Sequence, residues 1–164
     1  MKYLFAVMDD ETRFWIAQEV ADSKFKHDAR KIFQLAKEST GTKPKTIITD
    51  GLPAYHDAYL KEFWTAKKET RTEHINAIKL KGDMNNNKME RMNGEVRDRE
   101  KVIRGLKKKD TPILKGYQIF HNFIREHEGL DGKTPAERAG IKVEGENKWM
   151  TLIQNSTLAK RLSL

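Results

Sequence analysis

The sequence contains no cysteine. This absence excludes disulfide bonds, zinc sites built on thiolates and catalysis by a thiol nucleophile, and it fits a reducing cytoplasm. Long apolar runs are also missing, because no stretch approaches the roughly 20 residues that a membrane-spanning helix needs. The N-terminal apolar run is short and no small-residue cleavage site follows it, so we expect neither a secretory signal nor membrane association, and a cytoplasmic location.

Acidic residues are too few to balance the basic ones. The 164 residues include 32 lysines and arginines against 24 aspartates and glutamates, which gives a formal net charge of +8. Such a balance favours a polyanionic partner, and nucleic acid before a membrane surface. Charge alone leaves open a soluble protein that happens to be basic. The length suffices for one domain with its own hydrophobic core.

The hydrophobic pattern alternates between strands and helices. Two apolar segments, Tyr3–Met8 and Arg13–Val20, flank a polar turn and predict a β-hairpin. Short strands are predicted at 46–49 and 73–80. Further helices are predicted by apolar residues at helical spacing, by a capping box or by a proline at the first helical position: 27–38, from Pro53, from Pro112, from Pro135 and from Asn147. Strands that alternate with helices after a hairpin are typical of a mixed α/β sheet.

Apolar residues at helical spacing predict the core-facing side of two helices. In 27–38 the predicted core face holds Ala29, Ile32, Phe33 and Ala36, and in the helix from Pro112 it holds Ile113, Tyr117, Phe120 and Ile124. We interpret Trp15 and Trp64 as packing residues rather than platforms for stacked bases.

Residues 85–105 predict a helix of unusual charge. Met89, Met92, Val96 and Ile103 recur at helical spacing and form one apolar stripe. The remaining surface is basic through Arg91, Arg97, Arg99, Lys101 and Arg104. Glu90 is the single acid of the first turn, beside the stripe. A carboxylate there can offset the helix dipole, or it can bind a ligand.

Asp50 ends the strand 46–49 and stands just before the helix that begins at Pro53. The carboxyl ends of strands in an α/β sheet are where ligands bind. Together with Glu90, Asp50 could hold two divalent cations, and magnesium suits such hard oxygen ligands. The alternative for Asp50 is a plain turn residue, because Asp-Gly is a common turn dipeptide.

Two blocks of residues, together with the hairpin, carry a resemblance to a known family. Ile47–Tyr55, with its Thr-Asp-Gly-Leu-Pro-Ala-Tyr, and Asn85–Gly94, with its Asn-Asn-Asn-Lys-Met-Glu-Arg-Met-Asn-Gly, resemble the second Asp block and the Glu block of DDE insertion-sequence transposases and integrases. His121–Leu130 and Lys133–Glu137 are similar to the closing block of that family. One departure is Glu126, where the family often has proline.

The resemblance implies a function for these residues. It implies a ribonuclease H-like α/β core that cuts and joins DNA strands with two magnesium ions, with Asp50 and Glu90 as catalytic metal ligands. It also implies a DNA partner held by phosphate contacts, a nucleoid-associated location and a possible homo-oligomer. The expected DNA-binding residues are Arg91, Arg97, Arg99, Lys101, Lys107 and Lys108, although Lys107–Lys109 could equally be a solvated charge run. His74 stands near a family histidine, so it is either a phosphate contact or a strand-end residue.

A first strand and its aspartate are missing from the pattern. The family has three strands before its first helix, and the first of them, which carries the first catalytic Asp, is central in the sheet. Only two strands precede His27, so the resemblance implies that this strand lies upstream of Met1. Asp9 or Asp10 could substitute only if Tyr3–Met8 were the first strand, and we interpret both as turn residues.

The expected domain organisation is therefore a partial catalytic core over residues 1–141, followed by an extension over 142–164. Two functions follow from the sequence. One is a transposase catalytic domain that lacks one metal ligand, and the other is a non-catalytic module that binds DNA or pairs with an intact transposase subunit.

Overall fold

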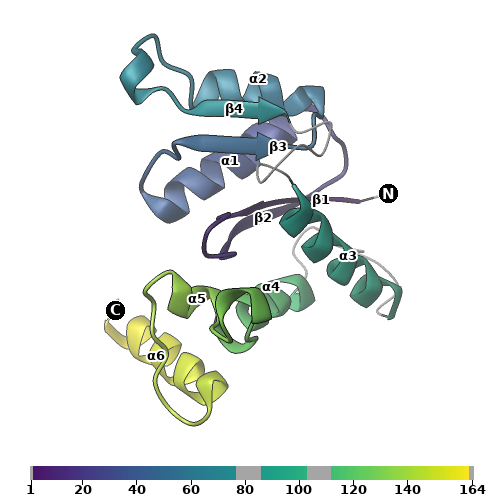
Figure 1. Ribbon diagram of the computed structural model, residues 1–164. Coiled ribbons are helices and arrows are strands. Elements are labelled where there is room, and N and C mark those ends of the chain that lie inside the picture. The colour runs from purple at the N-terminus through teal and green to yellow at the C-terminus, as the bar shows by residue number, and fades with distance from the viewer. Residues whose placement is uncertain (1, 77–85, 103–111, 163–164) are drawn as a thin grey trace. The chain divides into compact units, whose positions relative to one another are not determined.

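The computed structural model describes residues 2–76, 86–102 and 112–162 (Figure 1). Strands and helices alternate, as the sequence predicts for a mixed α/β protein. The strands are β1 (Tyr3–Met8), β2 (Trp15–Ala21), β3 (Thr46–Thr49) and β4 (Glu73–Asn76). The helices are α1 (Lys26–Thr40), α2 (Pro53–Glu62), α3 (Asn87–Val102), α4 (Pro112–Ile119), α5 (Pro135–Arg138) and α6 (Lys148–Leu162).

Short helical turns complete the chain. Among the described residues these are 3-10 turns at Lys68–Thr70 and Glu128–Leu130, and a π-helical turn at Phe120–Ile124 that continues α4. None of the helices within the described ranges is both long enough and apolar enough to cross a bilayer. Residues 77–80 of the predicted fourth strand, Ile103 of the basic helix and the run Lys107–Lys109 lie outside the described residues.

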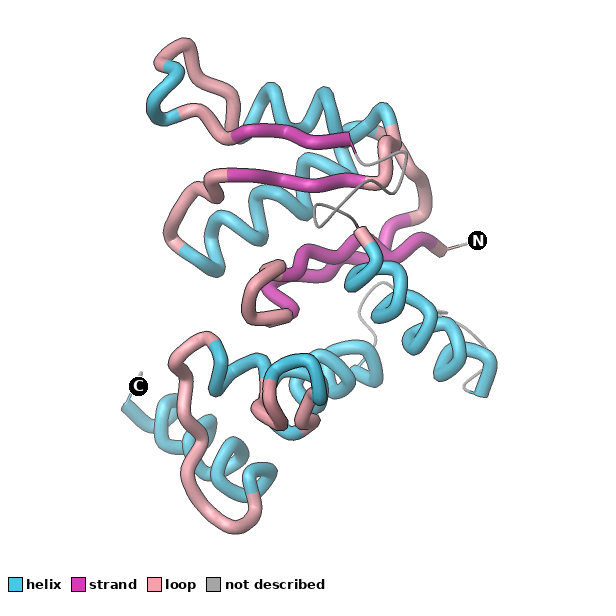
Figure 2. Tube along the Cα trace, in the orientation of Figure 1, coloured by secondary structure: helices cyan, strands magenta, loops and turns pink. Residues whose placement is uncertain are grey.

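The chain divides into two compact units. The first contains residues 1–8 and 16–111, and the second contains residues 9–15 and 112–164. In the first unit, β1 pairs with β2 in one two-stranded sheet, and β3 pairs with β4 in another. The β3–β4 pair is parallel, with Thr46 opposite Glu73 and Thr49 opposite Asn76. Figure 2 shows the four strands as two separate pairs.

One hydrophobic core serves both sheets of the first unit. The predicted face of α1 is confirmed, because Ala29, Ile32, Phe33 and Ala36 are all buried. The core adds Phe5, Ala17 and Ala21 from the hairpin and Ala58, Tyr59 and Phe63 from α2 and its end, and Ile47 of β3 packs against it. The two sheets therefore rest on the same layer of helices without pairing with each other in the described part of the chain.

A buried carboxylate ties α1 to α2. Glu62 accepts hydrogen bonds from Arg30 Nε at 2.6 Å, Gln34 Nε2 at 3.0 Å and Lys37 Nζ at 2.8 Å. Burial by itself would raise the pKa of Glu62, but the hydrogen bonds from Lys37 and Arg30 and the charges of these two residues lower it overall. The acid is thus kept ionised inside the helix pair.

In the second unit, the turn before β2 is held by side-chain amides. The Trp15 ring is fully buried. Its backbone N–H donates to Asn122 Oδ1 at 2.8 Å, and its carbonyl accepts from Asn122 Nδ2 at 2.9 Å and from Gln118 Nε2 at 2.9 Å. The Asn122 amide satisfies both polar groups of the Trp15 backbone, as a neighbouring strand would. The packing role that we predicted for Trp15 is confirmed.

The face predicted for α4 is partly wrong. Tyr117 is buried, but Ile113 is 53% exposed and Leu114 is buried in its place. The buried side continues through His121 and Asn122 of the π-helical turn, because these polar side chains bond to the backbone of residues 13–15. The apolar pattern alone misses a face whose burial depends on hydrogen bonds.

Other boundaries differ from the prediction by one or two residues. β2 begins at Trp15 instead of Arg13, and α1 extends to Thr40. Gly41 ends α1 with φ 65°, a left-handed conformation that glycine adopts without strain. The capping box at Thr134 is confirmed, with Glu137 N donating to Thr134 Oγ1 at 3.2 Å and Thr134 N donating to Glu137 Oε2 at 2.8 Å.

We expect the protein to lose stability as the pH falls from about 6.5 toward 4. His127 lies 4.8 Å from the His121 ring centroid, and burial followed by the charges of His121 and Arg125 lowers the pKa of His127 from 6.5 to about 4. The folded protein keeps His127 neutral in this window, whereas the unfolded chain binds a proton there, so acid favours unfolding.

Urea denaturation at about pH 7 and about pH 5 measures this effect. His127→Gln should show a smaller drop in unfolding free energy than the wild type between the two values. His27→Gln is the control, because the His27 side chain is 72% exposed. Equal drops in the wild type and in His127→Gln would contradict the prediction.

Candidate functional site

The carboxyl ends of β3 and β4 lie at the same edge of their sheet, because the two strands are parallel. Asp50 follows β3 directly, and its side chain is exposed. The Leu52 N–H donates to Asp50 Oδ1 at 3.1 Å, which closes a turn around Gly51. Gly51 has φ 85°, in the left-handed region that favours glycine. This turn places Asp50 between the end of β3 and the start of α2.

A hydrogen-bonded cluster lies immediately beside Asp50. Thr49 Oγ1 donates to Asn76 Oδ1 at 3.0 Å and lies 3.0 Å from His74 Nε2. Since the one hydroxyl proton of Thr49 goes to Asn76, His74 Nε2–H is the donor in the second bond. Burial, and then the nearby His56, lower the pKa of His74, so its imidazole is held in the neutral form.

Aromatic rings flank the same cluster. The His74 ring centroid lies 4.9 Å from that of Tyr59 and 6.0 Å from that of His56, the latter pair being stacked. Tyr59 OH donates to the Thr72 carbonyl at 2.7 Å, which anchors α2 to the segment entering β4. These contacts fix the strand end from which Asp50 projects.

The core continues to the edge of this site through Tyr55. Its ring lies 6.0 Å from Phe5 and 5.7 Å from Phe33, measured between ring centroids. Burial, and then the negative charge of Asp50, raise the pKa of Tyr55. Tyr55 therefore remains a neutral phenol, partly buried against the core.

Glu90 lies in the first turn of α3 and is exposed. The apolar stripe predicted for this helix is confirmed at Met92 and Val96, which are 2% and 4% exposed. All four basic residues predicted to contact DNA along this helix are exposed: Arg91, Arg97, Arg99 and Lys101. Lys101 Nζ also pairs with Asp98 at 3.0 Å. Lys107 and Lys108 lie outside the described residues.

Asp50 and Glu90 both belong to the first compact unit. In the described part of the chain, no group of three or more histidine, cysteine, aspartate or glutamate side chains is arranged to hold a metal ion. Asp50 and Glu90 are both exposed, and their role as a pair that binds a cation stays a prediction.

Sequence reasoning missed most of the cluster around Asp50. His74 was considered as a phosphate contact or strand-end residue, but Thr49, Asn76 and His56 gave no signal that separated them from ordinary strand and helix residues. The one available signal was position, since Thr49 immediately precedes Asp50 and His56 lies in the first two turns of α2.

Comparison with protein families gives a match over most of the chain. The family model described as the DDE domain matches residues 1–127. No curated protein and no solved structure matches the chain.

We expect Gly51→Ala to destabilise the protein and to displace Asp50. A β-carbon at φ 85° costs roughly 1–2 kcal/mol in the left-handed region. Gly94→Ala is the matched control, because Gly94 lies inside α3 and an added β-carbon there meets no atom within 4 Å. The control should gain about 0.5–1 kcal/mol of helix stability. Urea denaturation curves test both changes, and equal shifts of the two variants in one direction would contradict the expectation.

Proposed function

Since the chain belongs to the DDE-type insertion-sequence transposases, whose DDE domain matches residues 1–127, we propose that its residues form part of a metal-dependent centre for cleaving and transferring DNA strands. The observation that supports this most is the position of Asp50. Its exposed carboxylate stands at the carboxyl end of a parallel strand pair, on a turn that Gly51 and the Leu52 N–H hold in place. A strand end of this kind is where an α/β sheet binds its ligand.

Asp50 and Glu90 are the proposed metal ligands. Carboxylate oxygens suit Mg²⁺, and Asp50 Oδ1 is already oriented by its bond to the Leu52 N–H. Magnesium bound there would neutralise charge on the scissile phosphate and activate the attacking oxygen. The chain itself contributes a fixed strand end just before Asp50, through the Thr49–His74–Asn76 cluster.

The basic side of α3 is the proposed contact with the DNA backbone. Met92 and Val96 are buried along the apolar stripe, and Arg91, Arg97, Arg99 and Lys101 are exposed, as contact with phosphates requires. These contacts would position the duplex without reading its sequence. Lys107 and Lys108 remain predicted contacts, and the excess of basic residues supports the same partner.

We further propose that a strand inserts between the two sheets in the working catalytic core. The hairpin β1–β2 and the pair β3–β4 rest on one core but do not pair in the described part of the chain. A strand joining them would complete a ribonuclease H-like sheet and satisfy edge N–H and C=O groups. It would also bring the third carboxylate that the two-ion centre requires.

The alternative is a non-catalytic DNA-binding or transposase-pairing module. The lack of a three-residue metal group among the described residues favours it. In that case Asp50→Ala and Glu90→Ala should leave DNA binding unchanged, and no condition should give cleavage.

We expect manganese, as a paramagnetic substitute for magnesium, to broaden the amide NMR signals of residues 50–52 and 90–92 together. Both carboxylates would then hold the same ion, so Asp50→Asn should weaken the broadening at both segments. Asp57→Asn is the control, because Asp57 is another exposed acid of the same unit, on α2. Broadening at one segment alone would refute the shared site.

We expect little or no magnesium-dependent nicking of terminal-repeat DNA by these 164 residues, because a third carboxylate and a joining strand are needed. Supplying a joining strand that carries an aspartate, as an added N-terminal segment, should produce nicking that Asp50→Asn abolishes. Gel analysis of labelled terminal-repeat DNA measures both. Robust nicking by the 164 residues alone that Asp50→Ala abolishes would contradict the need for a further strand.

A further inference from the structure

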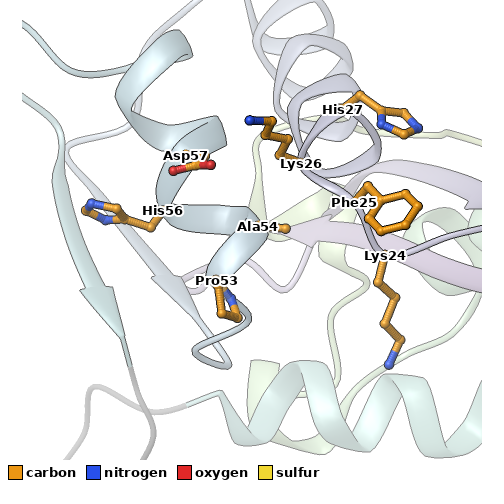
Figure 3. A pocket seen from close by; sticks show the side chains of 8 residues that line it. All are labelled: Lys24, Phe25, Lys26, His27, Pro53, Ala54, His56 and Asp57. Atoms are coloured by element: carbon orange, nitrogen blue, oxygen red, sulfur yellow. The ribbon is translucent and has the colours of Figure 1, made fainter.

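A pocket of about 630 Å³ opens between the N-terminal ends of α1 and α2 (Figure 3). Both helices belong to the first unit, and they pack closely on each other. None of the residues that line the pocket is among those proposed above to hold metal or the DNA duplex. They are Lys24, Phe25, Lys26, His27, Pro53, Ala54, His56 and Asp57.

Phe25 presents an aromatic face to solvent at this pocket. Its side chain is 66% exposed, whereas Phe5, Phe33 and Phe63 of the same unit are buried. The exposure does not come from a loose loop. Asp28 accepts hydrogen bonds from the Phe25 N–H at 3.3 Å and from the Ser23 hydroxyl at 2.5 Å, and the Phe25 carbonyl accepts from the Asp28 N–H at 3.1 Å. The first turn of α1 therefore fixes Phe25 at the surface.

The charges around Phe25 are mainly positive. Lys24 and Lys26 flank it in sequence and both are exposed, and Lys26 forms no ion pair with any described residue. Lys24 Nζ lies 4.7 Å above the centroid of the Tyr3 ring and remains accessible. Asp57, on the α2 side of the pocket in Figure 3, is the one carboxylate of the lining. An exposed ring between two lysines suits a ligand that has both a flat face and a negative backbone.

His56 connects the pocket to the strand end that carries Asp50. It lines the pocket and stacks on His74 with 6.0 Å between ring centroids, and His74 in turn bonds to Thr49. Thr49 is the residue before Asp50. The pocket and the end of β3 therefore share a line of side-chain contacts through His56.

We propose that this pocket binds an unpaired nucleotide of the DNA substrate, with its base stacked on Phe25 and its flanking phosphates at Lys24 and Lys26. The proposal rests on the function proposed above, since it takes DNA as the substrate. The base must be unpaired because both faces of a paired base are covered by its neighbours in the duplex. Stacking on an aromatic ring accepts every base, so the site supports affinity for single strands and not sequence readout.

The test compares binding of a fluorescein-labelled oligothymidine of about 15 nucleotides with binding of a duplex of the same length, by fluorescence anisotropy. Phe25→Ala should weaken single-strand binding about tenfold and leave duplex binding unchanged. Trp64→Ala is the matched control, because Trp64 is 47% exposed beside Arg71, whose guanidinium lies 5.1 Å from the ring centroid, but is outside the pocket. Circular dichroism melting confirms that each variant is folded.

A second experiment reverses the charge of the two lysines. Lys24→Glu combined with Lys26→Glu should weaken single-strand binding and reduce its salt dependence, while Phe25→Ala should leave that salt dependence unchanged.

Equal effects of Phe25→Ala and Trp64→Ala on single-strand binding would overturn the proposal, as would an equal loss of duplex binding. Tighter binding of the matching oligouridine RNA would overturn the assignment to DNA. Failure of the nicking and manganese experiments would refute the catalytic centre, whereas an unchanged single-strand affinity in Phe25→Ala would refute only the pocket.

Discussion

Burial of one face of α1 is the constraint on which the first unit depends. Ala29, Ile32, Phe33 and Ala36 form that face, and the hairpin, α2 and β3 all pack against the same core. Burial of apolar surface stabilises the folded state by on the order of 25 cal/mol for each Å² removed from water. A shared core can hold two short sheets in place even though they do not pair within the described residues. Glu62 adds a polar tie between α1 and α2 inside that core.

The position of Asp50 depends indirectly on the packing of this core. Tyr59 and Phe63 anchor α2 in the core, and Tyr59 also binds the backbone of Thr72 just before β4. With β3 and β4 in parallel register, Thr49 meets His74 and Asn76, and the chain turns at Gly51 into α2. Asp50 itself accepts one hydrogen bond, from the Leu52 N–H, and its carboxylate stays exposed. That combination of fixed backbone and exposed side chain suits catalysis by positioned ligands.

Exposed basic and aromatic side chains of the first unit lie on separate surfaces. The basic residues of α3 surround a stripe buried at Met92 and Val96, whereas Phe25 and its two lysines stand at the start of α1. A duplex backbone needs only positive charge, and an unpaired base also needs an aromatic face. The two surfaces are therefore chemically distinct, which is why we propose them for two different forms of DNA.

The sequence by itself determined the strands and helices, including the hairpin, the buried face of α1 and the strand that ends at Asp50. It also determined the family. Each of these depends on the spacing of nearby residues or on a contiguous block of residues. The sequence also identified Asp50 and Glu90, whose pairing remains a prediction. It did not identify the Thr49–His74–Asn76 cluster, the amide bridge from Asn122 to Trp15 or the pocket at Phe25. Those features join residues that are 25, 27 or 107 positions apart, or depend on which side of a helix stays uncovered. Only the tertiary structure decided them, because hydrogen bonding and burial across such separations leave no periodic signal in the chain.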